Sequence, residues 1–197
     1  MEFEDRAYSV LEVSASEKFN GVFAQILSGS RFASVKIAAG CQQAKRLLDA
    51  REFDLIIINA PLPDEFGDRF AADAAARTQA AVLLMTRPEL YDELLAKMAP
   101  QGVFMLSKQT SSAMIRQALD WMITAREMKR GAEKKTLKLS DKMDEIRLVN
   151  RAKLLLIEKE AMSEEEAHHW IERSAMNRCV TRRVIADEII EKYNKQQ

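Results

Sequence analysis

Basic side chains toward the end of the chain are of the type and spacing that could neutralise the phosphates of a nucleic acid. They are Arg147, Arg151, Lys153, Arg173, Arg178, Arg182 and Arg183. RNA recognition needs such cations for the phosphates, together with stacking or hydrogen-bonding groups for loop bases. Arg178 and Arg182 are four residues apart, and this spacing predicts that they share one face of a helix. The alternative for each arginine is a charge that only solvates a helix surface.

Short amphipathic helices are the elements that would position these cations. Ser163, followed three residues later by Glu166, has the pattern of a capping box, which begins a helix. The residues that follow at helical spacing predict one buried face; they are Ala167, Trp170, Ile171, Ser174 and Ala175. One apolar run before Ser163 and another after Asn177 complete a unit of three helices. Helices this short bury little surface alone, so they need each other or a partner.

This stretch resembles the ANTAR domain, the RNA-binding antitermination module of certain bacterial response regulators. The matching segments are residues 151–157 (RAKLLLI), 162–167 (MSEEEA) and 175–178 (AMNR), followed by the pairs Ile185-Ala186 and Ile189-Ile190. They follow the family's order and spacing, although Leu154 stands where the family commonly has glycine. The resemblance implies a small three-helix RNA-binding domain over residues 140–197.

The resemblance also implies which residues meet RNA. Contact would run through Arg151, Ala152 and Lys153 and through the segment 175–178, which includes Met176. Small Ala152 would let a base approach closely, and Lys153 would neutralise a phosphate. Trp170 could stack on a base, but its place at helical spacing favours a core role, and Met176 is likewise expected to pack.

The composition limits the kind of protein. Lys and Arg number 30 and Asp and Glu number 30 among 197 residues, so nucleic-acid binding would need a local basic surface. Hydrophobic residues make up 47%, which suits a packed core and argues against disorder. No apolar run approaches the roughly 18 residues of a membrane span, and the acidic amino terminus lacks a signal-peptide layout. We therefore expect a cytoplasmic protein without a membrane segment.

Neither the cysteines nor the histidines predict a metal or redox site. Cys41 and Cys179 are far apart in the sequence and lack the paired spacing that such sites require. His168 and His169 are adjacent, so on a helix they point to different faces and lack the i, i+4 spacing of a metal pair. No nucleophile–base pair or phosphate-binding loop is evident either. We therefore expect no cofactor, no metal and no enzymatic activity.

Strands and helices alternate through the first part of the chain. The predicted strands are 8–13, 33–38, 54–59, 80–86 and 103–106, the predicted helices are 17–27, 41–50, 67–77 and 89–98, and a long helix begins near Ser111 or Ser112. Residues 55–58 read Leu-Ile-Ile-Ile, as a parallel strand covered on both faces requires. This alternation predicts an α/β fold with a doubly wound five-stranded parallel sheet of flavodoxin-like order. In such sheets, ligands bind at the carboxyl ends of the strands.

Residues at those carboxyl ends carry a second resemblance, to the receiver domain of two-component response regulators over residues 6–125. It rests on the loop NAPLPDEFG at 59–67 and on GVFMLSK at 102–108. Thr86 and Lys108 stand where the family has its switch hydroxyl and its lysine. Asn59 occupies the position of the phospho-accepting aspartate, and Ser14 and Ala15 occupy that of the acidic pair that holds magnesium.

These substitutions remove the chemistry of aspartyl phosphorylation and predict a degenerate, pseudo-receiver domain. An amide is a poor nucleophile toward a phosphodonor, and magnesium prefers carboxylate oxygens, which positions 14 and 15 do not supply. Asp64 lies beyond the strand end and is a poor substitute acceptor. Lys108 would hydrogen-bond Asn59 or a backbone carbonyl, or else bind an anion. Thr86 is expected to be a satisfied strand-end hydroxyl.

From Ser112 onward the helical pattern persists beyond the receiver-like part. Residues at coiled-coil spacing are Ile115, Ala118, Met122, Ala125, Ala132, Leu139, Met143 and Ile146. The basic stretch 126–138 leaves two interpretations, a solvated linker or a helix that pairs in a homodimer, and the resumed seam favours the homodimer. The expected organisation is a receiver-like domain over 1–124, a helical connector over 112–146 and the ANTAR-like domain over 140–197.

The two resemblances together predict an RNA-binding transcription antiterminator, which would grip a leader hairpin so that an overlapping terminator cannot form. Without an acceptor aspartate at position 59, control would come from a regulatory protein or a ligand acting on the pseudo-receiver domain. The alternative is an adaptor whose helical tail docks on another protein. A DNA-binding regulator is less favoured, because no helix-turn-helix with its tight glycine turn is recognisable.

Overall fold

The computed structural model describes residues 6–194. The chain divides between Gly131 and Ala132 into two compact units, the first running through Gly131 and the second starting at Ala132. The division falls inside the predicted connector. Within the described residues, no helix is both long enough and apolar enough to cross a membrane.

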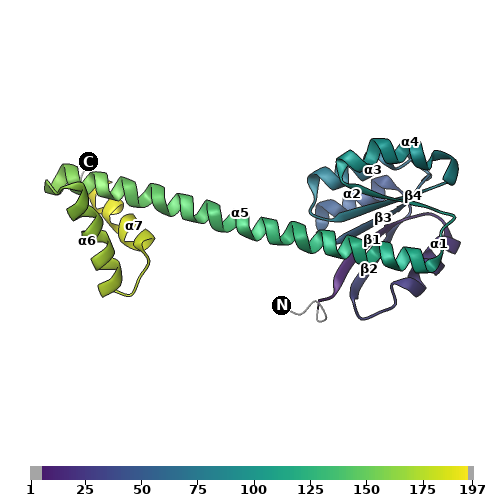
Figure 1. Cartoon of the computed structure of the whole chain (residues 1–197), viewed down its shortest axis with the longest axis horizontal. Helices are drawn as coiled ribbons and strands as arrows, with labels where there is room; N and C mark the ends of the chain where they lie inside the picture. Colours follow the sequence, from purple (N-terminus) through teal and green to yellow (C-terminus); the bar gives the residue numbers. More distant parts are fainter. Residues whose placement is uncertain (1–5, 195–197) are drawn as a thin grey trace. The chain divides into compact units, whose positions relative to one another are not determined.

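The first unit is built on a five-stranded parallel sheet (Figure 1). Its strands are β1 (Tyr8–Val13), β2 (Phe32–Ala38), β3 (Leu55–Asn59), β4 (Ala81–Thr86) and β5 (Val103–Ser107). Their order across the sheet is β2-β1-β3-β4-β5, and every neighbouring pair is parallel. Parallel strands need crossover connections, and helices supply them here, so the predicted doubly wound sheet is confirmed.

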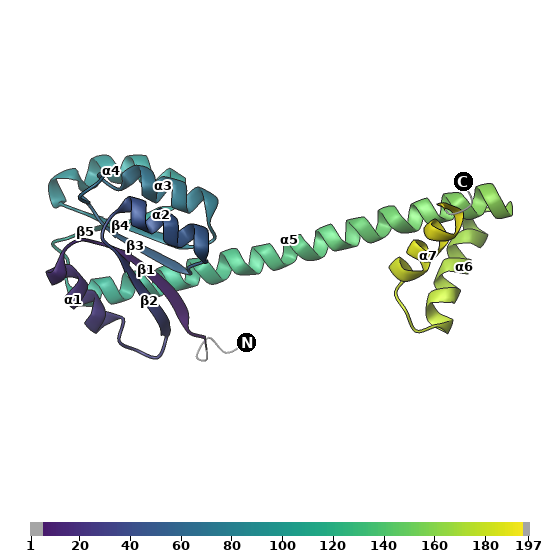
Figure 2. The same cartoon turned by 180° about the vertical axis from the view of Figure 1, so that it is seen from behind.

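Helices cover both faces of this sheet (Figure 2). On one face lie α2 (Cys41–Ala50), α3 (Asp68–Arg77) and α4 (Tyr91–Met98); on the other lie α1 (Glu17–Ile26) and the first part of α5 (Ser112–Glu160). Short 3-10 turns, η2 (Pro88–Leu90) and η3 (Ala99–Gln101), flank α4. The central strand β3 is buried along its whole length, because both of its faces are covered.

The second unit consists of the C-terminal part of α5 together with α6 (Glu164–Asn177) and α7 (Arg182–Asn194). Its core residues are Val149, Ala152, Leu156, Ala167, Ile171, Ala175, Ile185, Ala186, Ile189, Ile190 and Tyr193. The predicted capping box begins α6: the Ser163 hydroxyl accepts from the Glu166 N–H at 3.2 Å, and the Glu166 carboxylate accepts from the Ser163 N–H at 2.8 Å. The predicted three-helix unit is confirmed, and its first helix is the end of α5.

The long helix α5 is uninterrupted through Gly131, so the predicted connector and the first helix of the second unit are one element. Ile115, Ala118 and Met122 of the predicted coiled-coil seam are buried in the first unit. The prediction that they pair in a dimer is wrong, because the apolar face of α5 covers the sheet there. The later seam residues Leu139, Met143 and Ile146 are exposed.

The prediction that Arg178 and Arg182 share a helix face is also wrong. Helix α6 ends with Arg178 as its C-cap, and α7 begins at Arg182. Between them Cys179 adopts a left-handed backbone, with a φ of 51°. A left-handed residue ends the α-helical hydrogen-bond pattern, and the Thr181 hydroxyl then accepts a backbone hydrogen bond at 3.4 Å at the start of α7. No single helix therefore carries both arginines.

Candidate functional site

Ser14 and Asn59 meet at the carboxyl ends of β1 and β3 as a buried, uncharged pair. Asn59 is 6% exposed, and its Nδ2 donates to the Ser14 hydroxyl oxygen at 2.9 Å. The same oxygen accepts from the Ser16 N–H at 3.1 Å, just before α1. Asn59 Oδ1 is buried without a hydrogen-bond partner among the described residues, which is costly for a buried acceptor. Ala15, the other residue predicted here, is exposed.

Thr86 and Lys108 belong to the same site, at the ends of β4 and β5. Thr86 is fully buried and its hydroxyl has no hydrogen-bond partner in the described chain, so the prediction of a satisfied hydroxyl is wrong. The Lys108 N–H donates to the Thr86 carbonyl at 2.8 Å. The Lys108 ammonium makes no hydrogen bond within residues 6–194, so the predicted bond to Asn59 or a backbone carbonyl is not formed. Burial, and next the charge of Arg87, lower the pKa of Lys108.

The residues around Asn59 do not fit the magnesium ion that receiver chemistry uses. Magnesium is held by carboxylates and other hard oxygen ligands, whereas the side chains at positions 14, 15 and 59 are neutral and Lys108 adds positive charge. The Asp64 carboxylate is engaged elsewhere, accepting two backbone N–H groups at the start of α2 at 3.0 and 2.9 Å. These positions therefore supply neither an acidic nucleophile nor a carboxylate metal ligand.

A cavity of about 870 Å³ opens beside Asn59 at the carboxyl ends of the strands. Its apolar wall includes Phe19 and Phe23 of α1 and Ile115 of α5, and its cations are Lys18, Arg87 and Lys108. Pockets for small molecules span roughly 300–1,000 Å³. The predicted strand-end residues thus border a cavity of ligand size.

Glu12 is a buried carboxyl beside this site that the sequence patterns did not single out. It lies on β1 and is 1% exposed, and burial raises its pKa to about 7. With the Asn20 amide oriented to donate, Nδ2 lies 3.0 Å from Glu12 Oε1. The sequence feature that could have identified Glu12 is its position as the one acidic residue inside the strand Tyr8–Val13. Acidic side chains are rarely buried without a partner.

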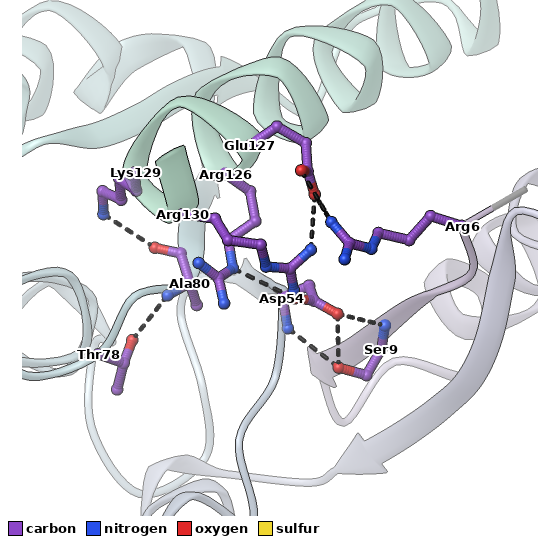
Figure 3. Close-up of polar contacts among 9 residues, drawn as sticks. All are labelled: Arg6, Ser9, Asp54, Thr78, Ala80, Arg126, Glu127, Lys129 and Arg130. Carbon is purple, nitrogen blue, oxygen red and sulfur yellow. Dashed lines mark hydrogen bonds and ion pairs between the residues drawn. The ribbon is translucent and has the colours of Figure 1, made fainter. Parts of the chain in front are cut away.

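An ionic cluster at the opposite, amino ends of the strands holds α5 to the sheet (Figure 3). Its centre is Asp54: Oδ1 accepts from Arg126 Nε at 3.2 Å and from Arg130 Nη2 at 2.8 Å. Asp54 Oδ2 accepts from the Ser9 N–H and hydroxyl at 3.0 and 3.1 Å. Glu127 accepts from Arg130 Nη1 at 2.6 Å and from Arg6 Nη1 at 2.9 Å. The Asp54 cluster therefore consists of Arg6, Ser9, Asp54, Arg126, Glu127 and Arg130.

The charge balance of this cluster favours ionised Asp54. Burial opposes its ionisation, but the hydrogen bonds from Ser9 and the charges of Arg130 and Arg126 outweigh burial, so the pKa of Asp54 is lowered. Lys129 adds a hydrogen bond to the Ala80 carbonyl at 3.1 Å. The basic stretch predicted as a linker or dimer helix thus begins as part of the packing of the first unit.

The predicted RNA-binding cations of the second unit divide into paired and unpaired side chains. Ion pairs join Lys153 to Glu164 (3.0 Å), Arg178 to Glu188 (2.5 and 2.7 Å), Arg182 to Glu145 (3.3 Å) and Arg147 to Asp144 (3.4 Å). Arg151, Arg173 and Arg183 are exposed and form no ion pair with any residue that the structure describes. The Lys153 side chain is 15% exposed, whereas the three paired arginines, Arg147, Arg178 and Arg182, are exposed. Exposed ion pairs contribute about 0–1 kcal/mol, so a phosphate can replace the carboxylate that pairs with each of these arginines at little cost.

Ala152, Met176 and Trp170 lie elsewhere than predicted. Ala152 is fully buried in the core of the second unit, so the prediction that it meets a base is wrong; its small side chain serves helix packing. Met176 is 77% exposed, so the prediction that it packs is wrong as well. Trp170 is 44% exposed, which contradicts the favoured core role and leaves part of its indole ring open.

The open part of Trp170 lies between two hollows in the surface of the second unit. One, of about 900 Å³, is lined by Trp170 together with Arg173, His169 and Asn177 on one part and with Glu165 and Glu166 on another. The other, of about 470 Å³, is lined by Trp170, by Arg178 at the end of α6 with its ion-pair partner Glu188, and by further residues of α7. An exposed aromatic ring next to cations can stack on an unpaired base while the cations hold its phosphate.

Known proteins similar to this chain agree with these two units. Residues 137–190 match the ANTAR domain. The chain is 26% identical over 168 residues to the transcriptional regulatory protein PdtaR of Mycobacterium tuberculosis (strain CDC 1551 / Oshkosh), an alignment that covers 85% of this chain and 82% of that protein.

Solved structures similar to this chain include receiver domains. The signal receiver domain of an HD domain-containing protein from Pseudomonas fluorescens Pf-5 matches 66% of this chain and 96% of its own, with a TM-score of 0.58 and 27% identity. A CheY-like receiver domain from Methanospirillum hungatei JF-1 matches 62% of this chain and 98% of its own, with a TM-score of 0.54 and 16% identity. These likenesses confirm the receiver-type fold of the first unit.

Proposed function

We propose that this chain, a response regulator with a receiver-like domain and a C-terminal ANTAR domain, is an RNA-binding transcription antiterminator that grips hairpin loops in nascent leader mRNA. The bound hairpin overlaps a terminator, which then cannot form. The observation that carries the proposal is the ANTAR match over residues 137–190, because this range contains every predicted RNA-contacting residue.

The contacts follow from exposure and charge in the second unit. Arg151, Arg173 and Arg183 meet phosphates first, since they give up no described ion pair on binding. The other predicted cations join by exchanging a carboxylate for a phosphate; they are Arg147, Lys153, Arg178 and Arg182. Trp170 stacks on an unpaired loop base, and exposed Met176 adds apolar contact at the end of α6.

A homodimer through α5 would present two RNA-binding units. Leu139, Met143 and Ile146 are spaced four and three residues apart and are exposed, as the seam of a coiled coil is in a single chain. A second copy of the helix buries them. Two linked binding units then gain affinity for paired hairpins through effective concentration.

Control of the antiterminator comes from a regulatory protein or a ligand acting on the first unit, in place of aspartyl phosphorylation. The neutral residues at positions 14, 15 and 59 support this step. Incubation with acetyl phosphate and magnesium should leave the mass and the oligomeric state of the protein unchanged. A stable gain of one phosphoryl group would contradict this form of control.

A gel-shift titration with a leader hairpin tests the RNA proposal. The double variant Arg151→Gln, Arg173→Gln removes two exposed cations, and each lost phosphate contact should flatten the salt dependence of log K by about 0.7–0.9. The matched control is Arg46→Gln, Arg69→Gln, which removes two exposed arginines from the first unit. Equally poor binding of the hairpin by the wild type and by both double variants at low salt would refute the proposal.

A second candidate is an adaptor whose second unit docks on another protein. The exposed apolar side chains of Met176, Trp170 and Val184 favour it, since such groups often mark protein contacts. An adaptor of this kind has no salt-dependent affinity for hairpin RNA. The same titration therefore separates the two functions.

A further inference from the structure

We propose that the cavity at the carboxyl ends of the strands binds a small amphipathic anion, in which a carboxylate or phosphate is attached to an apolar body. A ligand of this class would be the signal that controls the antiterminator, a role that rests on the proposed function. The binding itself does not depend on RNA and can be measured alone.

The charge of the cavity selects an anion. Lys18, Arg87 and Lys108 line the cavity, and none of its described lining residues is acidic. Within residues 6–194, these three side chains form no ion pair and no hydrogen bond. Burial and the charge of Arg87 lower the pKa of Lys108, so its protonated form carries a cost that a bound anion removes.

The buried side-chain amide of Asn59 has an oxygen that could accept a hydrogen bond from a ligand. Asn59 lines the cavity, and its Nδ2 is already bonded to the Ser14 hydroxyl at 2.9 Å. Its Oδ1 is left without a partner among the described residues. An amide oxygen can only accept, so the ligand should carry a hydroxyl or N–H group close to its anionic head.

The remaining wall of the cavity is apolar. Phe19, Val22 and Phe23 come from α1, and Ile115 comes from the first turns of α5. The Phe19 and Phe23 rings stack with centroids 4.4 Å apart. Phe23 is 1% exposed, so Phe19 and Val22 supply most of the open apolar area of this wall. Inorganic phosphate would leave this wall and most of the 870 Å³ unfilled, whereas an aromatic or aliphatic body buries it and gains hydrophobic free energy.

Anilinonaphthalene sulfonate is a suitable probe for the full-length protein, because it combines an anionic head, an N–H donor and an aromatic body. It should bind one site per chain with increased fluorescence, and its affinity should fall as salt is added. Lys108→Gln should weaken binding about tenfold, equivalent to ~1.4 kcal/mol. The matched control Lys36→Gln, at an exposed lysine of β2 outside the cavity, should leave the affinity unchanged.

Two further probes sharpen the assignment. Phenylnaphthylamine, the neutral counterpart of the dye, should bind more weakly than the dye, since it lacks the head that the cations hold. Competition by benzoate or by phenyl phosphate identifies the preferred head, and competition by either supports the site. Failure of both to compete would contradict it.

Equal dye affinity of the wild type and Lys108→Gln, or equal affinity for the charged and the neutral dye, overturns the inference. Thermal unfolding of each variant checks its fold, and Arg87→Gln, at an exposed cation of the same cavity, replaces Lys108→Gln if the latter does not fold. A hairpin gel shift on the same samples separates the two proposals. Dye binding without RNA binding refutes only the proposed function, and RNA binding without dye binding refutes only the cavity.

Discussion

Replacing Asp54 by alanine should weaken the attachment of the middle of α5 to the sheet of the first unit. Asp54 is the shared acceptor of the Asp54 cluster, and its side chain is 14% exposed, against 6% for its partner Arg126. Removing one partner of a buried ion pair costs about 3–5 kcal/mol. We expect the free energy of unfolding to fall by about 3 kcal/mol, at the lower end of this range, because Arg130 keeps its hydrogen bond to Glu127 at 2.6 Å.

The same helix offers a matched control for this substitution. Asp120 pairs with Arg31 at 2.9 Å, and these side chains are 57% and 51% exposed. An exposed ion pair contributes about 0–1 kcal/mol. Asp120→Ala should therefore leave the free energy of unfolding nearly unchanged, although it removes the same charge from a neighbouring part of the first unit.

Urea unfolding followed by tryptophan fluorescence measures the difference. Trp121 belongs to the first unit and Trp170 to the second, so a Trp170→Phe background reports on the first unit alone. A loss of about 3 kcal/mol should lower the urea midpoint by about 1–3 M, given slopes of about 1–3 kcal/mol per M. Equal midpoints for Asp54→Ala and Asp120→Ala would refute the anchoring role of the cluster.

The pH dependence gives an independent check on Asp54. Its folded pKa is lowered, so its contribution is fully present above the unfolded pKa and is lost as the pH falls through the folded value. The unfolded pKa of aspartate is about 3.9. The stability difference between wild type and Asp54→Ala should therefore be constant near neutral pH and shrink below about pH 4.

Three other substitutions test the second unit, the dimer and the buried acid. Trp170→Ala should weaken hairpin binding roughly 5- to 150-fold in a gel shift, because base stacking on an aromatic contributes about 1–3 kcal/mol, whereas Trp121→Ala, at an exposed tryptophan of the first unit, should have no effect. Leu139→Glu should convert the dimer to a monomer in sedimentation, whereas Leu137→Glu, equally exposed at 64% but outside the seam, should not. Burial raises the pKa of Glu12 from 4.5 to about 7, so wild-type stability should fall as the pH rises through this interval. Glu12→Gln should remove that slope and stabilise the protein at pH 8 by about 3 kcal/mol in thermal or urea unfolding.

Local pattern was sufficient to predict the elements of both units. The Leu-Ile-Ile-Ile run of β3 predicts a strand covered on both faces, and β3 is the buried central strand of the sheet. The capping box at Ser163 and Glu166 fixes the start of α6 through two local hydrogen bonds. Each of these two patterns involves residues within one helical turn or one strand, so the sequence alone is enough to predict the element.

The long helix itself was predicted, but the attachment of its basic stretch to the sheet could not be predicted in this way. Its basic stretch has few large apolar residues and contains Gly131, and glycine destabilises the interior of a helix. The start of that stretch is held by Asp54 and Ser9, which lie far away in the sequence. Asp54 precedes a strand, and Arg126 and Arg130 lie on a much later helix. Their ion pairs become apparent only in the folded structure, so the sequence pattern does not predict them.

The site shows the same limit. The topology predicts that Asn59 and Ser14 meet, because neighbouring parallel strands end at one edge of the sheet. Whether a hydroxyl or an ammonium finds a partner depends on every group packed around it, so the unbonded Thr86 and Lys108 could not be foreseen. Trp170 illustrates the same point: Ala167, Ile171 and Ala175 already fill the buried face of α6, which leaves the indole outside.

If a cavity ligand controls RNA binding as proposed, we expect the signal to pass within one chain through α5, because α5 is the only described element with residues in both units. Its first turns line the cavity through Ile115, its middle belongs to the Asp54 cluster, and its end supplies Ala152 to the core of the second unit. A ligand changes RNA affinity only if it binds one arrangement of such an element more tightly than another. Loosening the Asp54 cluster frees the middle of α5 from the sheet, so Asp54→Ala should reduce the effect of a cavity ligand on hairpin affinity. The hairpin affinity without ligand should change far less, because no residue of the cluster belongs to the second unit.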